Sequence, residues 1–134
     1  MFEEYGHAVA SLALWAVIMI SLSPISVQAR TEAARAECGR PKRDYDDRGY
    51  RADRALMNAV EATGPFVAAT LAAMFAGASP FWVNLLASLF IVARIAMAYV
   101  HIATTNQTTR SAFWAIGTLS LLLLALFALG ALFL

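Results

Sequence analysis

Residues 111–134 read SAFWAIGTLSLLLLALFALGALFL and contain no charged residue. This run of 24 residues is long enough, at about 1.5 Å of rise per helical residue, to cross a hydrocarbon core about 30 Å thick. It has the least ambiguous hydropathy of any segment in the chain. We therefore take it as a membrane-spanning helix and work outward from it.

Three further runs have similar length and composition, at residues 5–27, 55–78 and 81–104. Hydrophobic residues make up 60% of the 134 residues and charged residues 14%, whereas soluble domains average about 45–50% and 25%. A soluble fold of this size could not hide so much apolar surface. The sequence predicts an all-α integral membrane protein, with residues 1–134 forming one four-helix bundle and a tight turn at Ala78-Ser79-Pro80.

Most of the charge lies in one connection. Of the 19 charged residues, 14 fall within residues 30–54, eight of them basic and six acidic. Every basic residue outside the predicted spans lies in this connection or at Arg110, so the positive-inside rule makes that side cytoplasmic. Both termini then face outward, as expected in a bacterial inner membrane. The acids balance the bases, which gives nucleic-acid binding no support.

The cytoplasmic loop, about residues 30–50, divides into two parts. Residues 31–37 are mostly good helix formers and predict that the first helix continues into the cytoplasm, ending at Gly39 and Pro41. The charged stretch from Arg40 to Tyr50 is predicted to be irregular. Cys38 is the only cysteine, so no intrachain disulfide can form, and no metal-ligand spacing is present.

Polar side chains follow one face of the predicted second span. At about 100° per residue, Arg51, Arg54, Asn58 and Glu61 fall within an arc of about 80°. A charge near the middle of a membrane costs about 2.5–3.5 kcal/mol on insertion scales, so such a face should point into the protein. The pattern predicts a polar pocket near the cytoplasmic boundary.

Two buried charges should lie at similar depths. Glu61 follows Arg54 by seven residues, which places it about 10 Å below the boundary. Arg94 precedes Thr104 by ten residues on a helix returning to the same boundary, which places it about 15 Å deep. Similar depth and opposite charge predict an ion pair between Glu61 and Arg94, either purely structural or at the floor of a site.

Further candidates lie where the predicted helices end at the cytoplasmic side. Arg30 closes the first helix, and Arg110 opens the fourth after Thr108 and Thr109, which could cap it. The unpaired N–H groups of a helix start favour an anion. His101 lies on the same face as Arg94 near the end of the third helix. Together these residues predict a net-positive pocket for a small, polyanionic, amine-bearing ligand.

The segment Arg54-Ala55-x-x-Asn58-x-x-Glu61, followed by Pro65-Phe66, resembles the signature R-A-x-x-N-x-x-E-x-x-x-P-F. This signature belongs to the MAPEG family, the membrane-associated proteins in eicosanoid and glutathione metabolism. The similarity extends over nearly the whole chain, including the four spans and the charged first loop. The chain most resembles bacterial-type members similar to microsomal glutathione transferases.

The resemblance implies a homotrimer that binds glutathione, as co-substrate, between neighbouring subunits near the cytoplasmic side. A lipophilic small molecule would enter from the membrane lipids. Arg110 would be the catalytic residue that stabilises the glutathione thiolate, which suits a thiol whose unperturbed pKa is about 8.5. The expected binding residues are Arg30, Arg51, Arg54, Asn58, Glu61 and Arg94, with Tyr99, His101 or both.

Some positions depart from the family pattern. His101 stands where eicosanoid-making members carry a tyrosine, and Tyr99 lies on another face of the same helix, so either could line the site. Met97 stands where some members carry a polar residue. The resemblance therefore favours a glutathione transferase or peroxidase without specifying an eicosanoid reaction.

Two other classes of function compete with this one. A non-catalytic trimer of the same kind could bind a lipid or another anion in the same pocket. A small proton-coupled multidrug exporter has a similar length but needs an acid inside its first span, and no acid lies there in this chain.

Overall fold

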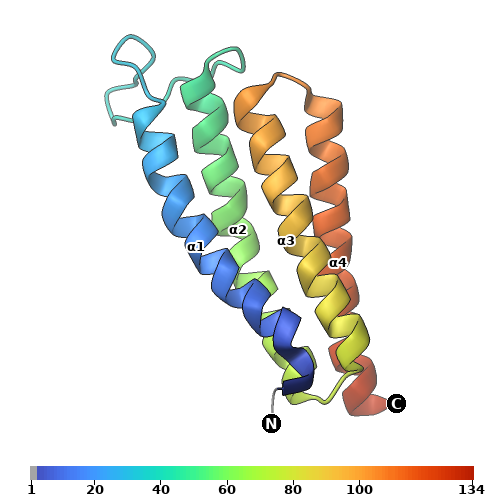
Figure 1. Cartoon of the computed structure of the whole chain (residues 1–134). Helices are drawn as coiled ribbons and strands as arrows, with labels where there is room; N and C mark the ends of the chain where they lie inside the picture. Colours follow the sequence, from blue (N-terminus) through green and yellow to red (C-terminus); the bar gives the residue numbers. More distant parts are fainter. Residues whose placement is uncertain (1–2) are drawn as a thin grey trace.

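The computed structural model describes residues 3–134 and consists of four long helices (Figure 1). They are α1 (Gly6–Gln28), α2 (Arg48–Phe75), α3 (Pro80–Ala103) and α4 (Gln107–Phe133), and a 3-10 turn (Glu3–Tyr5) precedes α1. The predicted all-α fold class is confirmed. Figure 1 places both termini at one end of the bundle and the α1–α2 and α3–α4 connections at the other.

Three segments are long and apolar enough to cross a membrane: Glu3–Gln28, Pro80–Ala103 and Gln107–Phe133. The helix α2 is comparable in length but more polar, because its first turns carry several charges and Glu61 lies further along it. The part of α2 beyond Glu61 carries no charged residue. The charged turns of α2 therefore extend beyond the apolar part of the bundle.

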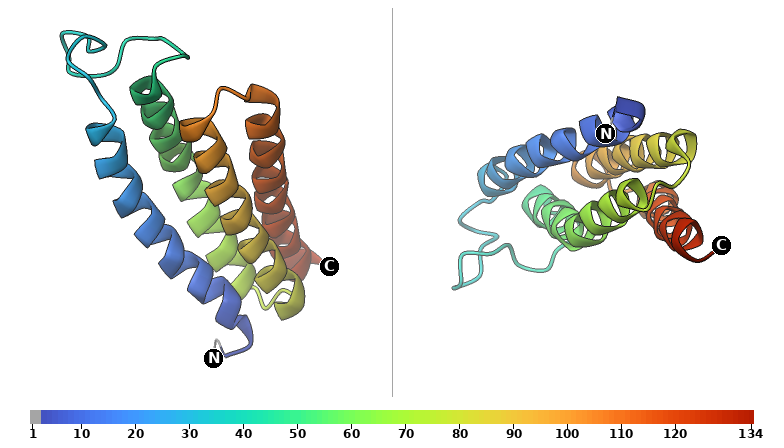
Figure 2. Two further views of the ribbon diagram at one scale, coloured as in Figure 1. Left: turned by 45° about the horizontal axis from the view of Figure 1, so that its top comes forward. Right: turned by 90° about the horizontal axis from the view of Figure 1, so that it is seen from below.

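The helices α1 and α4 both pack on α2 and α3, on opposite sides of the bundle (Figure 2). An aromatic cluster joins the first three helices. Phe66 stacks on Phe90 with ring centroids 4.1 Å apart, and Trp15 contacts both rings edge-on at 5.9 and 5.0 Å. The indole Nε1 of Trp15 donates to Thr63 Oγ1 at 3.0 Å, so the one polar atom of the cluster is paired.

The end of the bundle near the termini is fixed by specific hydrogen bonds. The Tyr5 hydroxyl donates to the carbonyl oxygen of Ala78 at 2.6 Å. The side chain of Asn84 accepts from the Ala8 N–H at 2.9 Å and donates to a backbone carbonyl of the N-terminal turn. Gly77 adopts a positive φ of 69°, which ends α2 and lets Pro80 begin α3 after a connection of only four residues. The predicted tight turn is present.

The predicted cytoplasmic extension of the first helix is wrong. Helix α1 ends at Gln28, and residues 31–37 form turns in place of a helix. The chain folds back on itself, with the Ala36 N–H donating to the Arg40 carbonyl at 2.8 Å and with Gly39 at a φ of 79°. The turn at Gly39 and the hydrogen bonds within the connection take the place of the helix that the propensities of these residues favoured.

Two helix starts also differ from expectation. Helix α2 begins at Arg48, inside the stretch predicted to be irregular, with the Asp47 carboxylate accepting from the Tyr50 N–H at 2.9 Å. The cap of α4 is Asn106, whose Oδ1 accepts from the Thr109 N–H at 3.0 Å, so the predicted threonine cap is wrong. Arg110 nevertheless lies in the first turn of α4, close to its positive end.

Candidate functional site

A polar cavity of about 460 Å³ opens at the end of the bundle that carries the α1–α2 and α3–α4 connections. We call it the rim pocket. It combines side chains from the ends of α2, α3 and α4 at these connections with others from the α1–α2 connection itself, and none of the described residues that line it is acidic. Its lining residues are Arg43, Tyr45, Tyr50, Arg54, His101 and Arg110. Three guanidinium groups and no carboxylate make the rim pocket suitable for an anion.

His101 is the most buried residue of the rim pocket, with 2% of its surface exposed. Its ring stacks on that of Tyr45 with centroids 6.0 Å apart. Neither ring nitrogen has a hydrogen-bond partner among the described residues. Buried polar atoms in proteins are nearly always paired, so an unpaired imidazole lining a cavity indicates a place for a polar group of a ligand.

The arginines of the rim pocket have hydrogen-bond donors that are not used within residues 3–134. Arg54 makes no hydrogen bond or ion pair with any residue in 3–134, although it is half-buried. Arg110 donates from Nη2 to Ser111 Oγ at 3.2 Å, and its buried Nε has no partner in the described chain. These donors, with the start of α4 beside them, give the rim pocket its capacity to bind an anion.

Arg51 does not line the rim pocket, although it shares the predicted polar face. It is buried, and its Nη1 donates to the carbonyl oxygens of Tyr45 at 2.9 Å and Asp46 at 2.7 Å. Its Nη2 donates to the carbonyl of Ile102 at 3.4 Å. Arg51 therefore joins the α1–α2 connection to the end of α3, and its role in this chain is to position the loop.

Arg30 is also paired inside the protein. Its Nη2 lies 2.9 Å from Asp53 Oδ1, and the two side chains are 19% and 9% exposed. Arg40 approaches the other carboxylate oxygen at 3.9 Å. Gly49 makes the close approach possible, because a Cβ there would lie 2.8 Å from the carbonyl oxygen of Ala29. Arg30 thus holds the end of α1 against the start of α2.

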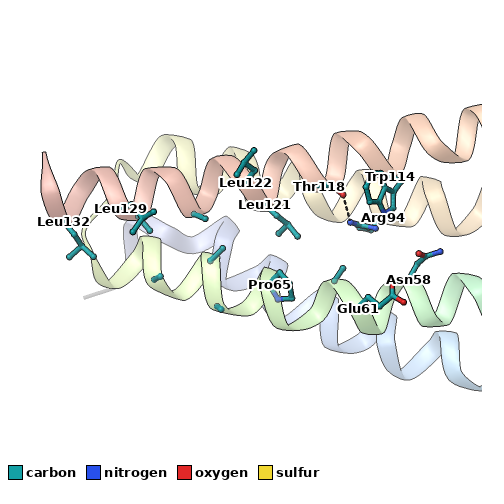
Figure 3. Close-up of a pocket in the computed structure, with 16 residues that line it drawn as sticks. Asn58, Glu61, Pro65, Arg94, Trp114, Thr118, Leu121, Leu122, Leu129 and Leu132 are labelled. Atoms are coloured by element: carbon teal, nitrogen blue, oxygen red, sulfur yellow. Dashed lines mark hydrogen bonds between the residues drawn. The ribbon is translucent and has the colours of Figure 1, made fainter.

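A second cavity, of about 700 Å³, runs between α2 and α4, and we call it the α2–α4 groove (Figure 3). Asn58, Glu61, Arg94 and Thr118 give it a polar end, and the rest of its lining is mostly alanine and leucine. Its lining residues are Asn58, Glu61, Ala62, Pro65, Ala68, Ala69, Ala72, Arg94, Trp114, Thr118, Leu121, Leu122, Ala125, Ala128, Leu129 and Leu132.

The polar end of the groove lies directly below the rim pocket. Asn58 follows Arg54 by one helical turn on α2, and Trp114 follows Arg110 by one turn on α4. Asn58 is buried, and its Nδ2 has no hydrogen-bond partner among the described residues. The cationic pocket and the apolar groove are therefore one helical turn apart, and the turn between them on α2 ends at the unpaired amide of Asn58.

The predicted ion pair between Glu61 and Arg94 is not formed within the chain. Ion pairs within residues 3–134 join Asp53 to Arg30 and to Arg40. Glu61 is exposed on the α2 side of the groove, whereas Arg94 is buried and donates to Thr118 Oγ1 at 3.2 Å (Figure 3). The sequence predicted similar depths for the two residues, and both do line the groove. Depth alone does not show whether the two side chains point toward each other.

The position of Arg94 depends on Gly117. A Cβ at position 117 would lie 2.9 Å from Arg94 Nε, so Gly117→Ala would push the guanidinium away from Thr118. We expect Gly117→Ala to lower stability by about 1–3 kcal/mol, the usual cost of overpacking, measured as a fall in the midpoint of thermal unfolding in detergent. Gly64→Ala is the control, because a Cβ at that helical glycine meets nothing within 4 Å. Equal midpoints for the two variants would contradict the packing argument.

The structure places Tyr99 and His101 in different environments. His101 lines the rim pocket, whereas Tyr99 is 71% exposed on the outer surface of α3. Of the two candidates that the sequence left open, His101 therefore belongs to the pocket of the single chain.

The structure brings Arg54, His101 and Arg110 together at the rim pocket and Asn58, Glu61 and Arg94 at the groove. Sequence reasoning missed Arg43, Tyr45 and Tyr50, because residues of an irregular loop follow no helical periodicity. It also missed Asp53, which lies outside the arc of the polar face. The sequence does show that Asp53 lies between Arg51 and Arg54, and this placement could have indicated an ion pair.

Within residues 3–134 four long helices, three of them long and apolar enough to cross a membrane, define an all-helical integral membrane protein, and a cationic pocket lies at one end of the bundle. The chain belongs to the MAPEG family: a model of this family matches residues 8–130, nearly the whole chain. The family acts broadly in eicosanoid and glutathione metabolism. No curated protein matches the chain in sequence.

Proposed function

We propose that this protein binds glutathione at the rim pocket and activates its thiolate toward a lipophilic electrophile, either as a transferase that conjugates the thiolate to the electrophile or as a peroxidase that reduces a hydroperoxide while two glutathione molecules are oxidised to the disulfide. The observation that carries the proposal is the position of the cationic rim pocket one helical turn from the polar end of the apolar α2–α4 groove, along both α2 and α4. Glutathione is a small anionic peptide, and an electrophile dissolved in the bilayer would reach the site along apolar helices. The excess of basic residues around the rim pocket supports a cytoplasmic location for it, with both termini outside.

The proposed roles follow from the hydrogen-bonding groups of each side chain that have no partner within residues 3–134. Arg54 and the unpaired ring of His101 would hold polar groups of the peptide, and the free amide of Asn58 would bind it one turn deeper. Arg110, at the start of α4, would stabilise the thiolate. Arg94 and Trp114 would then face the electrophile in the groove.

We further propose that the working unit is a homotrimer. Glu61 supports this, because a carboxylate exposed on the membrane part of α2 would face lipid in a single chain, at a cost of about 2.5–3.5 kcal/mol. A neighbouring copy packed against the groove would cover it. The alanines of the groove allow such a helix to approach closely.

Isothermal titration of glutathione into the purified protein in detergent tests the binding step. Turnover is then measured with a panel of aryl halides and hydroperoxides. The proposal predicts saturable binding at millimolar glutathione or below and thiol-dependent turnover of at least one substrate. An absence of binding would refute it, and binding without turnover across the panel would favour the non-catalytic anion- or lipid-binding alternative.

A further inference from the structure

We infer that residues 32–42 form a flap beside the rim pocket, that an ion pair between Arg40 and Asp53 latches this flap closed, and that its opening controls ligand exchange. The flap belongs to the α1–α2 connection, and its last residue is followed directly by Arg43, which lines the rim pocket. A displacement of the flap therefore moves one wall of the pocket. The inference adds a gate to the rim pocket and does not specify the ligand.

Hydrogen bonds within the flap make it a small hairpin. An antiparallel bridge joins its two arms. The Ala36 N–H donates to the Arg40 carbonyl at 2.8 Å, and the Lys42 N–H donates to the Ala34 carbonyl at 2.7 Å. Gly39, with a φ of 79°, provides the turn between the arms. The flap can therefore move as a unit without losing its own hydrogen bonds.

Few contacts hold the flap against the helices. None of residues 32–42 is buried, so no side chain of the flap is packed into the bundle. Within residues 3–134, two polar contacts join the flap to the rest of the chain. Arg30 Nη1 donates to the Gly39 carbonyl at 3.5 Å, and Arg40 Nη1 lies 3.9 Å from Asp53 Oδ2. A segment with so few buried contacts is one that opens at a low cost in free energy.

Asp53 is placed to hold both the helices and the flap. Its Oδ1 lies 2.9 Å from Arg30 Nη2, which fixes the end of α1, while its Oδ2 approaches Arg40 of the flap. The Arg40 side chain is 59% exposed, so this second contact is the weaker one and can break while the first remains. All these contacts lie within one chain, so each subunit of an oligomer carries its own latch.

Beyond the flap the chain is held again. Arg51 Nη1 donates to the carbonyl of Tyr45, and the ring of Tyr45 stacks on that of His101. Residues 43 and 44 lie between the flap and this anchor, so the chain has to bend there when the flap opens. Opening then withdraws Arg43 and widens the path from solvent to His101, which is 2% exposed when the flap is closed.

The first test needs no ligand. Diethyl pyrocarbonate modifies histidine, and mass spectrometry of the full-length protein in detergent gives the rate at His101, with the exposed His7 in the first turn of α1 as internal reference. We expect Arg40→Gln to raise the rate at His101 roughly 2- to 5-fold, the range for loss of an exposed ion pair. Arg40→Lys should restore most of the wild-type rate. Arg35→Gln is the control, because it removes an exposed arginine of the flap whose side chain makes no hydrogen bond or ion pair within residues 3–134. Equal rates in Arg40→Gln and Arg35→Gln would overturn the latch.

Hydrogen exchange separates a flap that moves from one that unfolds. A hinge motion keeps the hydrogen bonds inside the flap, so the amides of Ala36 and Lys42 should be as protected in Arg40→Gln as in the wild type. A loss of their protection in step with the gain in rate at His101 would show local unfolding and would overturn the flap.

The second test measures glutathione exchange by stopped flow, and this part rests on the proposed function. A gate lies on the path in both directions, so Arg40→Gln should raise the association and dissociation rates by the same factor, roughly 2- to 5-fold, and leave Kd unchanged. A changed Kd with an unchanged association rate would mean that Arg40 acts on the bound ligand, and the inference would be wrong. If the wild-type protein binds no glutathione, the proposed function fails, whereas the rates at His101 still decide whether the flap exists.

Discussion

Replacing Arg110 by alanine is expected to lower kcat for glutathione transfer roughly 100-fold, the typical cost of removing one preorganised donor from a developing anion. Arg110 lies in the first turn of α4, lines the rim pocket and keeps a buried Nε without a partner among the described residues. A cation there favours the thiolate over the thiol, which at neutral pH is the main form of an unperturbed cysteine. The affinity for glutathione should change far less than kcat.

The thiolate role has a direct spectroscopic readout. Thiolates absorb in the ultraviolet where thiols do not, so bound glutathione should show thiolate absorbance in the wild type and lose it in Arg110→Ala. Arg110→Lys should keep part of the absorbance, because it retains the charge. Arg48→Ala removes an exposed arginine outside both cavities and serves as the control. Equal losses in kcat and in affinity would refute the proposed role.

Replacing Asp53 by alanine is expected to destabilise the protein by about 3 kcal/mol, the lower end for breaking a buried ion pair, because Arg30 is 19% exposed. The loss leaves the Arg30 guanidinium without its counter-charge. It also frees Arg40 and loosens the loop that carries Arg43. The measurement is the thermal unfolding midpoint in detergent, together with the affinity for glutathione, and both should fall.

A double-variant cycle separates the ion pair from other effects of position 53. Arg30→Gln combined with Asp53→Asn should be more stable than the sum of the two single changes predicts, because neither charge is then left unpaired. Asp46→Asn changes an exposed acid of the same loop whose carboxylate makes no hydrogen bond or ion pair within residues 3–134, and it should be nearly neutral. A strictly additive cycle would show that the pair contributes nothing.

The sequence was sufficient to predict the four helices, because each apolar run is as long as a membrane is thick and is bounded by charge or proline. It was not sufficient for residues 31–37, where good helix formers gave way to turns. The ion pair between Arg30 and Asp53 ties the chain back at that point. Two residues separated by 23 positions, one of them in a loop, leave no periodic pattern to detect.

For the candidate site, too, the sequence predicted some features and missed others. Helical spacing correctly brought Arg54, Asn58 and Glu61 to one side of α2, where they reach two adjoining cavities. Spacing could not show that Arg51 donates its hydrogen bonds to loop carbonyls. Spacing also gives depth along a helix without the direction of a neighbouring helix, which is why it paired Glu61 with Arg94.

Arg94 has to enter the membrane during synthesis as a charge without an acidic neighbour in its own helix. Its contacts there are Phe90 and Met97, and its hydrogen bond to another helix goes to Thr118 on α4. Helices α3 and α4 are joined by residues 104–106 alone. If they insert together as a hairpin, the guanidinium meets its hydroxyl partner as it leaves water. In that case α3 would be fully accommodated in the membrane only once α4 has been made.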